Sequence, residues 1–319
     1  MSFGEIIGNN RNIAILQRVV SSGRIAHAYL FIGPEGVGKK KSAEAFIAAL
    51  FCGNNDACGN CSSCRKLAAG SHPDLHLLVP DGQFIKIDQV RELQRELAYR
   101  PYEAPRKACI IDGADKLNQS SGNALLKTLE EPPGNALMIL LATTADSVLP
   151  TIRSRCQQLL FSGIPTEEIE EFLMGRGTPA ETAQVAASLA DGSITKGLAL
   201  CNVDIMAQRS AIISAACGLR RQEIANLFTL GEMFDKDREK ADQAMELLAS
   251  FWRDLLLLRS GSGQMVNRDL LTMLQEEAAR RSERTILENI EQLGRTRGAI
   301  KRNANVRLAL DVLSMKLAT

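Results

Sequence analysis

The strongest constraint on the fold is a glycine-rich stretch, Gly33–Ser42, which reads GPEGVGKKKS. It follows an apolar run, Ala28–Ile32, that is typical of a buried strand, and it precedes a helical pattern over Ala43–Leu50. Strand, glycine turn and helix are the context of a phosphate-binding loop. Glycine lets backbone N–H groups approach phosphate oxygens, and the helix N-terminus favours an anion. The stretch therefore predicts an α/β domain built around a nucleotide-type loop.

This loop departs from the phosphate-binding pattern at one position. Gly33, Gly36, Gly38 and Lys39 match the pattern, and we expect Lys39 to reach the β- and γ-phosphates. The pattern then asks for Ser or Thr, whose hydroxyl holds Mg²⁺, but Lys40 stands there. A tight strand-to-helix turn that binds no nucleotide is therefore the second interpretation of the stretch.

Two further strands predict side chains beside the loop. Ala108–Asp112 is an apolar run that ends in an acid, which suits a carboxylate ordering Mg²⁺ near a phosphate. Gly113 follows, where hydrolysing enzymes usually carry a glutamate that polarises the attacking water. Leu137–Ala142 is another buried run, and the hydroxyl of Thr143 after it can face a γ-phosphate. Ligands of parallel sheets bind beyond the carboxyl ends of strands, so we expect these groups to converge. Ordinary strand caps are the alternative.

A second specific pattern is the cysteine cluster, which comprises Cys52, Cys58, Cys61 and Cys64. It contains two overlapping C-x-x-C units, and four thiolates satisfy tetrahedral Zn²⁺ in a closed structural site. The spacing therefore predicts structural zinc, with reduced thiols on a loop as the plain alternative. His72 or His76 could replace Cys52 as the fourth ligand, but both lie beyond a helical stretch.

Length and composition limit the classes of protein to which this chain can belong. A chain of 319 residues suggests two or three domains, and 45% hydrophobic with 24% charged residues is ordinary for a globular protein. A net charge of +1 and 4% aromatic residues argue against base stacking and an extended basic surface. No apolar run approaches the roughly 18 residues of a membrane span. The first residues show no signal peptide, so we expect a cytoplasmic protein whose eight cysteines form no disulfide framework.

Several stretches resemble the bacterial DNA polymerase III clamp-loader ATPases, which are members of the AAA+ group. They are His27–Lys39, the cysteine cluster, Asn123–Pro133 and Thr151–Cys156. The fold class that this resemblance implies is α/β, with an AAA+ P-loop domain, a small helical lid and a C-terminal all-α collar domain. The implied boundaries are 1–163 for the P-loop domain with its parallel sheet and a zinc knuckle at 52–64, 164–205 for the lid and 206–319 for the collar.

The resemblance also implies roles for single residues. Ser154-Arg155-Cys156 matches the motif whose arginine reaches into a neighbouring subunit's ATP site, so Arg155 is the catalytic candidate, acting in trans. From the residues alone, Arg155 is an ordinary surface charge. Thr143 or Thr144 matches the sensor beside the γ-phosphate. Lys196 stands near the place of a second sensor, which is usually arginine.

Lys40, Gly113 and Lys196 are three departures from a hydrolytic site. They favour a clamp-loader subunit with little or no ATPase activity, itself not a polymerase, that donates Arg155 to a neighbour. Its implied partners are the gamma/tau and delta subunits, with the sliding clamp and primer–template DNA reached through the complex. ATP is a possible ligand, Mg²⁺ a doubtful one. The alternatives are an ATP-hydrolysing motor subunit of the gamma/tau kind and a zinc-dependent DNA-binding module.

Overall fold

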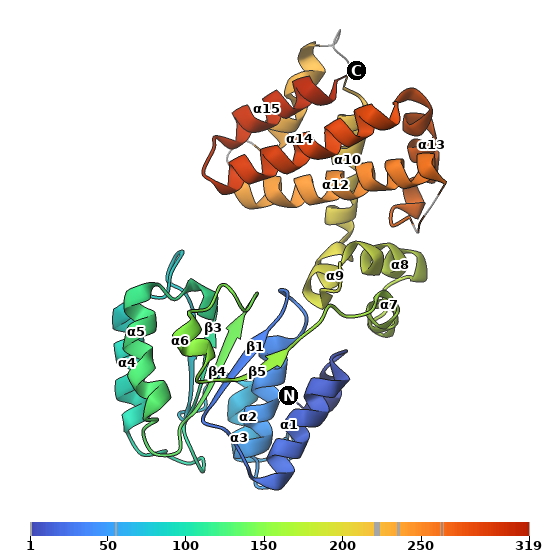
Figure 1. Ribbon diagram of the computed structural model, residues 1–319. Helices are drawn as coiled ribbons and strands as arrows, with labels where there is room; N and C mark the ends of the chain where they lie inside the picture. Colours follow the sequence, from blue (N-terminus) through green and yellow to red (C-terminus); the bar gives the residue numbers. More distant parts are fainter. Residues whose placement is uncertain are drawn as a thin grey trace. The chain divides into compact units, whose positions relative to one another are not determined.

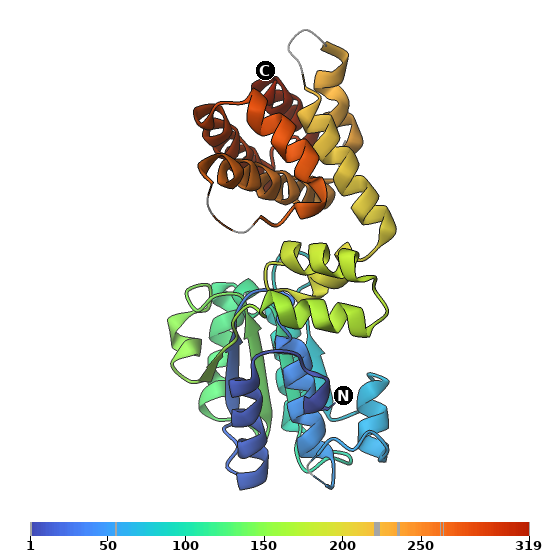
Figure 2. The ribbon, with the colours of Figure 1, turned by 90° about the vertical axis from the view of Figure 1, so that its right-hand side faces the viewer.

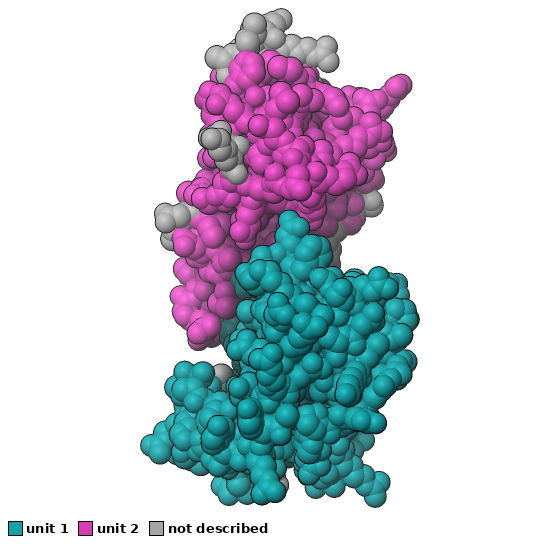
Figure 3. Space-filling view, turned by 90° about the vertical axis from the view of Figure 1, so that its left-hand side faces the viewer, with its two compact units in different colours: residues 1–172, 192–195 teal, residues 173–191, 196–319 magenta. Residues whose placement is uncertain are grey.

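The chain folds as two compact units in its computed structural model, which describes residues 2–54, 56–219, 224–234, 237–261, 263 and 265–318. Unit 1 comprises residues 1–172 and 192–195, and unit 2 comprises residues 173–191 and 196–319 (Figure 3). Each unit has a hydrophobic core of its own. Within the described residues, no helix combines the length and the apolar character needed to cross a membrane.

Unit 1 is built on a five-stranded parallel sheet (Figure 1). Its strands are β1 (Ala28–Ile32), β2 (Leu75–Leu78), β3 (Ala108–Asp112), β4 (Leu137–Ala142) and β5 (Gln157–Leu160). Their spatial order is β2-β3-β4-β1-β5, which places β4 between β1 and β3. Ile32 pairs with Ala142, and Asp112 pairs with Leu141, so these three strands end at the same edge of the sheet.

Helices cover both faces of this sheet (Figure 1). One face carries α1 (Asn10–Ser22) and α2 (Lys39–Phe51), and the other carries α4 (Ile87–Ala98) and α5 (Gln119–Glu130). Successive side chains of a strand point to opposite faces. Phe31 therefore packs with residues of α1 and α2, whereas its neighbour Leu30 packs with residues of α4 and α5. The result is a three-layer α/β domain.

Short elements complete unit 1. They are η1 (Phe3–Glu5), α3 (Ser62–Ala68), η2 (Ala114–Lys116) and α6 (Pro150–Arg153), and α7 (Thr166–Gly175) contains the first division between the units. The position of α6 depends on a close approach to α5. A Cβ on Gly122 of α5 would lie 2.3 Å from a methyl carbon of Leu149, so a larger residue would have to displace this side chain. Ile152 of α6 is fully buried beside it.

The described part of unit 2 is helical (Figure 2). Its elements are α8 (Ala180–Leu189), α9 (Ile194–Leu200), α10 (Val203–Cys217), η3 (Ile224–Phe228), α11 (Thr229–Phe234), α12 (Arg238–Ser260), η4 (Arg268–Leu270), α13 (Leu271–Arg280), α14 (Glu283–Lys301) and α15 (Val306–Leu317). Phe251 and Trp252 of α12 lie fully buried in its core. Arg281 is buried too, stacked on Trp252 and bonded to Glu277, so it serves the packing of this unit.

The predicted fold class is confirmed: a parallel α/β domain is followed by helices, and the cysteine cluster lies together. The strands predicted at 28–32, 108–112 and 137–142 occupy those residues. The sequence does not predict β2, because this edge strand buries only Leu78 and shows no apolar run. The two units divide the chain at other residues than the three predicted domains do, and the predicted domain boundaries stay predictions.

Candidate functional site

The glycine loop (residues 33–38) connects β1 to α2 and is tied down by the chain itself. Gly36 and Gly38 have φ angles of +77° and +91°, a left-handed conformation that favours glycine. A Cβ on Gly36 would lie 1.9 Å from the Ser193 hydroxyl oxygen, and the Ile194 amide donates to the Gly36 carbonyl at 3.0 Å. A Cβ on Gly33 would lie 2.2 Å from the Phe161 carbonyl oxygen. The glycines are therefore needed for packing as well as for any ligand.

Lys39, the first residue of α2, is folded back on this loop. Its ammonium group donates hydrogen bonds to the carbonyl oxygens of Gly33 and Pro34, the latter at 2.6 Å. Burial lowers the pKa of Lys39, and the carboxylates of Glu35, Asp115 and Asp112 act against that shift. Gly38 caps the helix without a side-chain hydrogen bond, so the amides of the first turn are available to an anion. A phosphate group can use Lys39 once its ammonium leaves the two carbonyls.

Lys40 forms an ion pair with Asp112, the last residue of β3. Its Nζ atom lies 3.2 Å from Oδ2 of Asp112, and both side chains are partly exposed. Mg²⁺ requires an octahedral shell of oxygen ligands at about 2.0–2.1 Å. Here the expected hydroxyl is replaced by an ammonium group, which holds the carboxylate that the metal would use and repels a second cation. The residues therefore do not fit a Mg²⁺ site.

Thr143 follows β4 and faces the carboxylate of Asp115, for which the sequence suggests only a helix cap. Its Oγ1 donates to Oδ2 of Asp115 at 3.3 Å. Asp115 lies in η2, three residues after Asp112, because Gly113 reverses the chain with a φ of +97°. The available signal is the glycine between two acids, which predicts a tight turn that returns the second acid to the strand end. Asp115 belongs to the site on this geometry.

The position of the missing glutamate is occupied by a glycine with a structural role. Gly113 has a left-handed backbone, and a Cβ there would lie 3.2 Å from Cγ of Pro80. A larger residue would therefore meet both backbone strain and a crowded proline ring. The site brings together Lys39, Lys40, Asp112 and Thr143 as predicted, but without the hydroxyl and the acid that hydrolysis uses.

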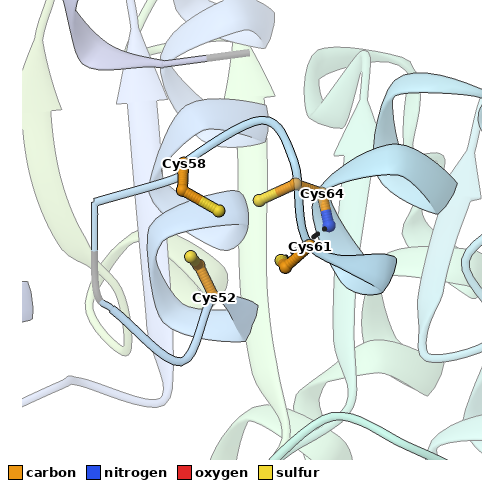
Figure 4. A group of neighbouring side chains, drawn as sticks. All are labelled: Cys52, Cys58, Cys61 and Cys64. Carbon is orange, nitrogen blue, oxygen red and sulfur yellow. Dashed lines mark hydrogen bonds between the residues drawn. The ribbon is translucent and has the colours of Figure 1, made fainter.

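The cysteine cluster is assembled at the far end of α2 from Lys39 (Figure 4). Cys52 caps the C-terminus of α2, Cys64 lies in α3, and Cys58 and Cys61 come from the segment between the two helices. The four Sγ atoms all lie within 4.8 Å of one another. Cys61 Sγ also accepts a hydrogen bond from the amide of Cys64 at 3.4 Å, which orients the knuckle.

The two histidines considered as substitute ligands do not join this cluster. Nδ1 of His72 accepts the Asp74 amide at 3.2 Å, and its ring packs on Phe51 with centroids 4.9 Å apart. His76 lies in β2. Among the described residues, the set of possible metal ligands at this place is the four cysteines, with Cys52 as the fourth member.

This donor set fits a closed tetrahedral zinc site. Zn–S bonds of about 2.3 Å place four sulfurs roughly 3.8 Å apart, which lies within the 4.8 Å limit on their separations here. Burial raises the pKa of the Cys64 thiol to about 12 in the absence of a metal charge. Zn²⁺ would reverse that shift because a coordinating thiol loses its proton. Four thiolates leave no ligand position for a water, so the chemistry supported here is structural.

The arginine turn (residues 154–156) connects α6 to β5. Nη1 of Arg155 donates to the Thr151 carbonyl oxygen at 2.9 Å, and Nη2 pairs with Glu130 at the end of α5. The Arg155 side chain is 35% exposed and that of Glu130 is 51% exposed. Arg153, just before the turn, is similar: its side chain is 33% exposed, and Nη1 donates to the Ala145 carbonyl oxygen and pairs with Asp146 at 3.2 Å. The turn thus presents one guanidinium group at the surface, held by an exposed acid that the sequence analysis did not single out.

Lys196, the candidate second sensor, takes part in an ion network of unit 2. Its ammonium group donates to Glu246 of α12 at 2.9 Å. Glu246 also pairs with Arg297, which in turn binds Asp242. Lys196 is therefore paired by its own unit.

Two sequence models of one family match this chain. The first, "DNA polymerase III, delta subunit", matches residues 8–165. The second, "DNA polymerase III, delta subunit, C terminal", matches residues 204–315. Together the two matches account for well over half of the chain.

Curated relatives carry names of the same complex. A DNA polymerase III subunit delta' from Bacillus subtilis is 28% identical over 96% of this chain and 95% of that protein. A subunit delta' from Pseudomonas aeruginosa is 35% identical over 63% of each chain. A subunit gamma/tau from Mycobacterium tuberculosis is 30% identical over 99% of this chain, which spans 61% of that protein.

Proposed function

This chain belongs to the DNA polymerase III delta-prime family of clamp-loader subunits, and we propose that it lends Arg155 to the ATP site of a neighbouring subunit. In this proposal the chain hydrolyses ATP weakly or not at all. A guanidinium group placed on a transferring phosphoryl neutralises developing charge, and such arginine fingers raise rates about 10³–10⁵-fold. The chain would thus help to open the sliding clamp and load it onto primer–template DNA.

The observation that carries this proposal is the placement of Arg155. The turn that holds it is fixed, because α6 packs against α5 through Gly122 and buries Ile152. Its guanidinium group is nevertheless at the surface, and its one acidic partner, Glu130, is itself half exposed. Exposed ion pairs contribute only about 0–1 kcal/mol to stability. The pair with Glu130 should therefore be little obstacle when the Arg155 guanidinium group moves to a phosphate.

The contacts of the chain's own loop support weak hydrolysis. Lys40 pairs with Asp112, Gly113 replaces the water-polarising glutamate, and Lys196 pairs with Glu246. Losing one preorganised electrostatic group commonly costs about 10²–10³ in rate. This site lacks the Mg²⁺-binding hydroxyl and the water-polarising glutamate, and its second-sensor lysine is paired with Glu246. We therefore expect it to be a poor catalyst.

The division into a P-loop domain (1–163), a lid (164–205) and a collar domain (206–319) is part of the proposal. The collar would assemble with gamma/tau and delta subunits. Its support is an exposed apolar row on α15, formed by Leu308, Val312 and Met315 at helical spacing. Such a row is typical of a helix that packs against a partner. We also propose that the cysteine cluster holds a structural Zn²⁺ ion.

The test replaces Arg155 in a reconstituted loader. With Arg155→Ala we expect ATP turnover at the neighbouring site to fall at least about 10³-fold and clamp loading to stop. Arg155→Lys keeps the charge but loses the planar fork, so it should restore only part of the rate. Arg91→Ala is the control, because it removes another exposed arginine of unit 1 that pairs with an acid, Asp88. Unchanged turnover with Arg155→Ala in an assembled loader would refute the proposal.

A motor subunit of the gamma/tau kind is the second candidate. One observation favours it: Lys39, Asp112 and Thr143 converge at neighbouring strand ends, as a nucleotide site requires. Turnover near one per second by the purified chain, abolished by Lys39→Ala, would favour this function over the first. Turnover at background would exclude it.

A further inference from the structure

The ion pair between Lys40 and Asp112, which supports weak hydrolysis above, also bears on how the glycine loop can hold a ligand. It lies where the AAA+ pattern places a divalent cation, between the start of α2 and the end of β3. We propose that the Lys40 ammonium group replaces that cation, so that the glycine loop binds a nucleoside polyphosphate without Mg²⁺. The inference rests on the proposed nucleotide loop and is independent of the Arg155 finger.

The two lysines at the start of α2 have partners at the ends of different strands. Lys39 reaches back to the carbonyl oxygens of Gly33 and Pro34, which follow β1. Lys40 reaches Asp112, two strands away in the sheet order. A polyphosphate lying on the first turn of α2 would therefore meet both ammonium groups. In the usual pattern the second of these charges belongs to the metal.

The loop is preorganised for this role. Nδ2 of Asn9 donates to the carbonyl oxygens of Val37 and Ser162, at 3.4 and 3.1 Å, and Ile194 bonds to Gly36. The backbone of the loop is thus fixed from two distant segments before any ligand arrives. The uncapped first turn of α2 then supplies amide donors to phosphate oxygens, and neither these amides nor the two lysines require a metal.

Charge explains why Lys40 and Mg²⁺ exclude each other. Mg²⁺ bound to Asp112 would need the carboxylate that Lys40 already holds at 3.2 Å, and it would lie next to a positive ammonium group. At such distances like charges repel strongly even in a partly solvated site. Mg²⁺ should therefore neither be needed for binding nor improve it, and the bound nucleotide should persist unhydrolysed.

The experiment measures the affinity of fluorescent ADP and ATP for the full chain, in EDTA and in excess Mg²⁺. For the natural chain we expect the two dissociation constants to agree within about twofold. Lys40→Thr removes the internal cation, frees Asp112 and supplies a hydroxyl. This variant should bind at least about tenfold more tightly with Mg²⁺ than with EDTA. Lys41→Thr is the matched control, since it removes the next, exposed lysine of α2 and should keep the ratio near one.

A second variant keeps the test decisive if Lys40→Thr fails to fold. Asp112→Asn leaves Lys40 in place and removes a negative charge near the phosphates. A metal-free site should bind nucleotide as tightly or more tightly with this change in both buffers, whereas a site that holds Mg²⁺ through Asp112 would lose affinity in excess Mg²⁺. The inference is overturned if the natural chain binds nucleotide only with Mg²⁺, or binds none in either buffer. Both results would leave the Arg155 finger standing, because its test uses the neighbour's ATP site.

Discussion

The glycine loop and the arginine turn carry the same kind of side chain for opposite uses. Lys39 and Lys40 are bound by groups of their own unit, namely loop carbonyls and Asp112. Arg155 is held at the surface by Glu130, which is itself exposed. Exposure does not separate the two regions, since the side chains of Lys40 and Arg155 are 43% and 35% exposed. Their places do: Lys40 reaches the carboxyl end of β3, whereas Arg155 precedes the first residue of β5, at the other edge of the parallel sheet. The proposed roles of the two regions rest on this difference in place.

The largest difference in stability between the two regions should appear when the proposed zinc ion is removed. The cysteine cluster lies at the C-terminal end of α2, the helix that begins with Lys39 and Lys40, so loss of zinc should loosen this helix. With Cys58→Ser we expect loss of one bound zinc per chain and a fall of at least about 2 kcal/mol in the free energy of unfolding. That is a fraction of the roughly 10–16 kcal/mol with which zinc-finger peptides bind zinc. Elemental analysis and denaturant titration measure the two quantities.

Hydrogen exchange then locates the effect of the missing metal. Amides of α2 should exchange faster in Cys58→Ser, while those of α6 should keep their protection. Cys201→Ser is the control, because this half-buried cysteine lies outside the cluster. A natural chain that purifies without metal, or a Cys58→Ser chain with full stability, would contradict the zinc proposal. Equal loss of protection at α2 and α6 would instead show that the two regions unfold together as one cooperative unit.

Restoring the missing glutamate should fail for a structural reason. Gly113→Glu places a side chain on a backbone with a φ of +97° and crowds Pro80, so we expect a loss of about 1–2 kcal/mol in unfolding free energy. Gly134→Glu is the matched control, since Gly134 has a φ of +59° but open space around it. The difference between the two variants measures the proline contact. ATP turnover of the isolated chain should stay at background, and a clear gain in turnover would contradict the weak-hydrolysis proposal.

Sequence reasoning predicted those features that a continuous pattern specifies. The central strands are unbroken apolar runs, and the four cysteines are close in sequence, so both could be identified. Features that depend on three-dimensional pairing could not. The approach of Asp115 to Thr143 needs the turn at Gly113, and the pairing of Arg155 with Glu130 needs the packing of α6 on α5. The edge strand β2 has too little buried surface to leave a pattern.

The smallest effect concerns the acid that holds Arg155. Glu130→Gln keeps the shape of the side chain but removes its charge, so it weakens the ion pair without opening space. Because the pair is exposed, we expect a change of no more than about 1 kcal/mol in stability. In the reconstituted loader the variant should raise ATP turnover by up to about fivefold, since the guanidinium group no longer has to leave a carboxylate.

Two comparisons make this small effect interpretable. Glu131→Gln, which neutralises the next, exposed residue, should leave turnover unchanged. The gain from Glu130→Gln should also shrink as salt is raised, because ions screen an exposed pair in the natural chain as well. If Glu130→Gln instead lowers turnover toward the level of Arg155→Ala, then Glu130 positions the guanidinium group for its target. The sign of this one change thus decides whether the acid restrains the arginine or aims it.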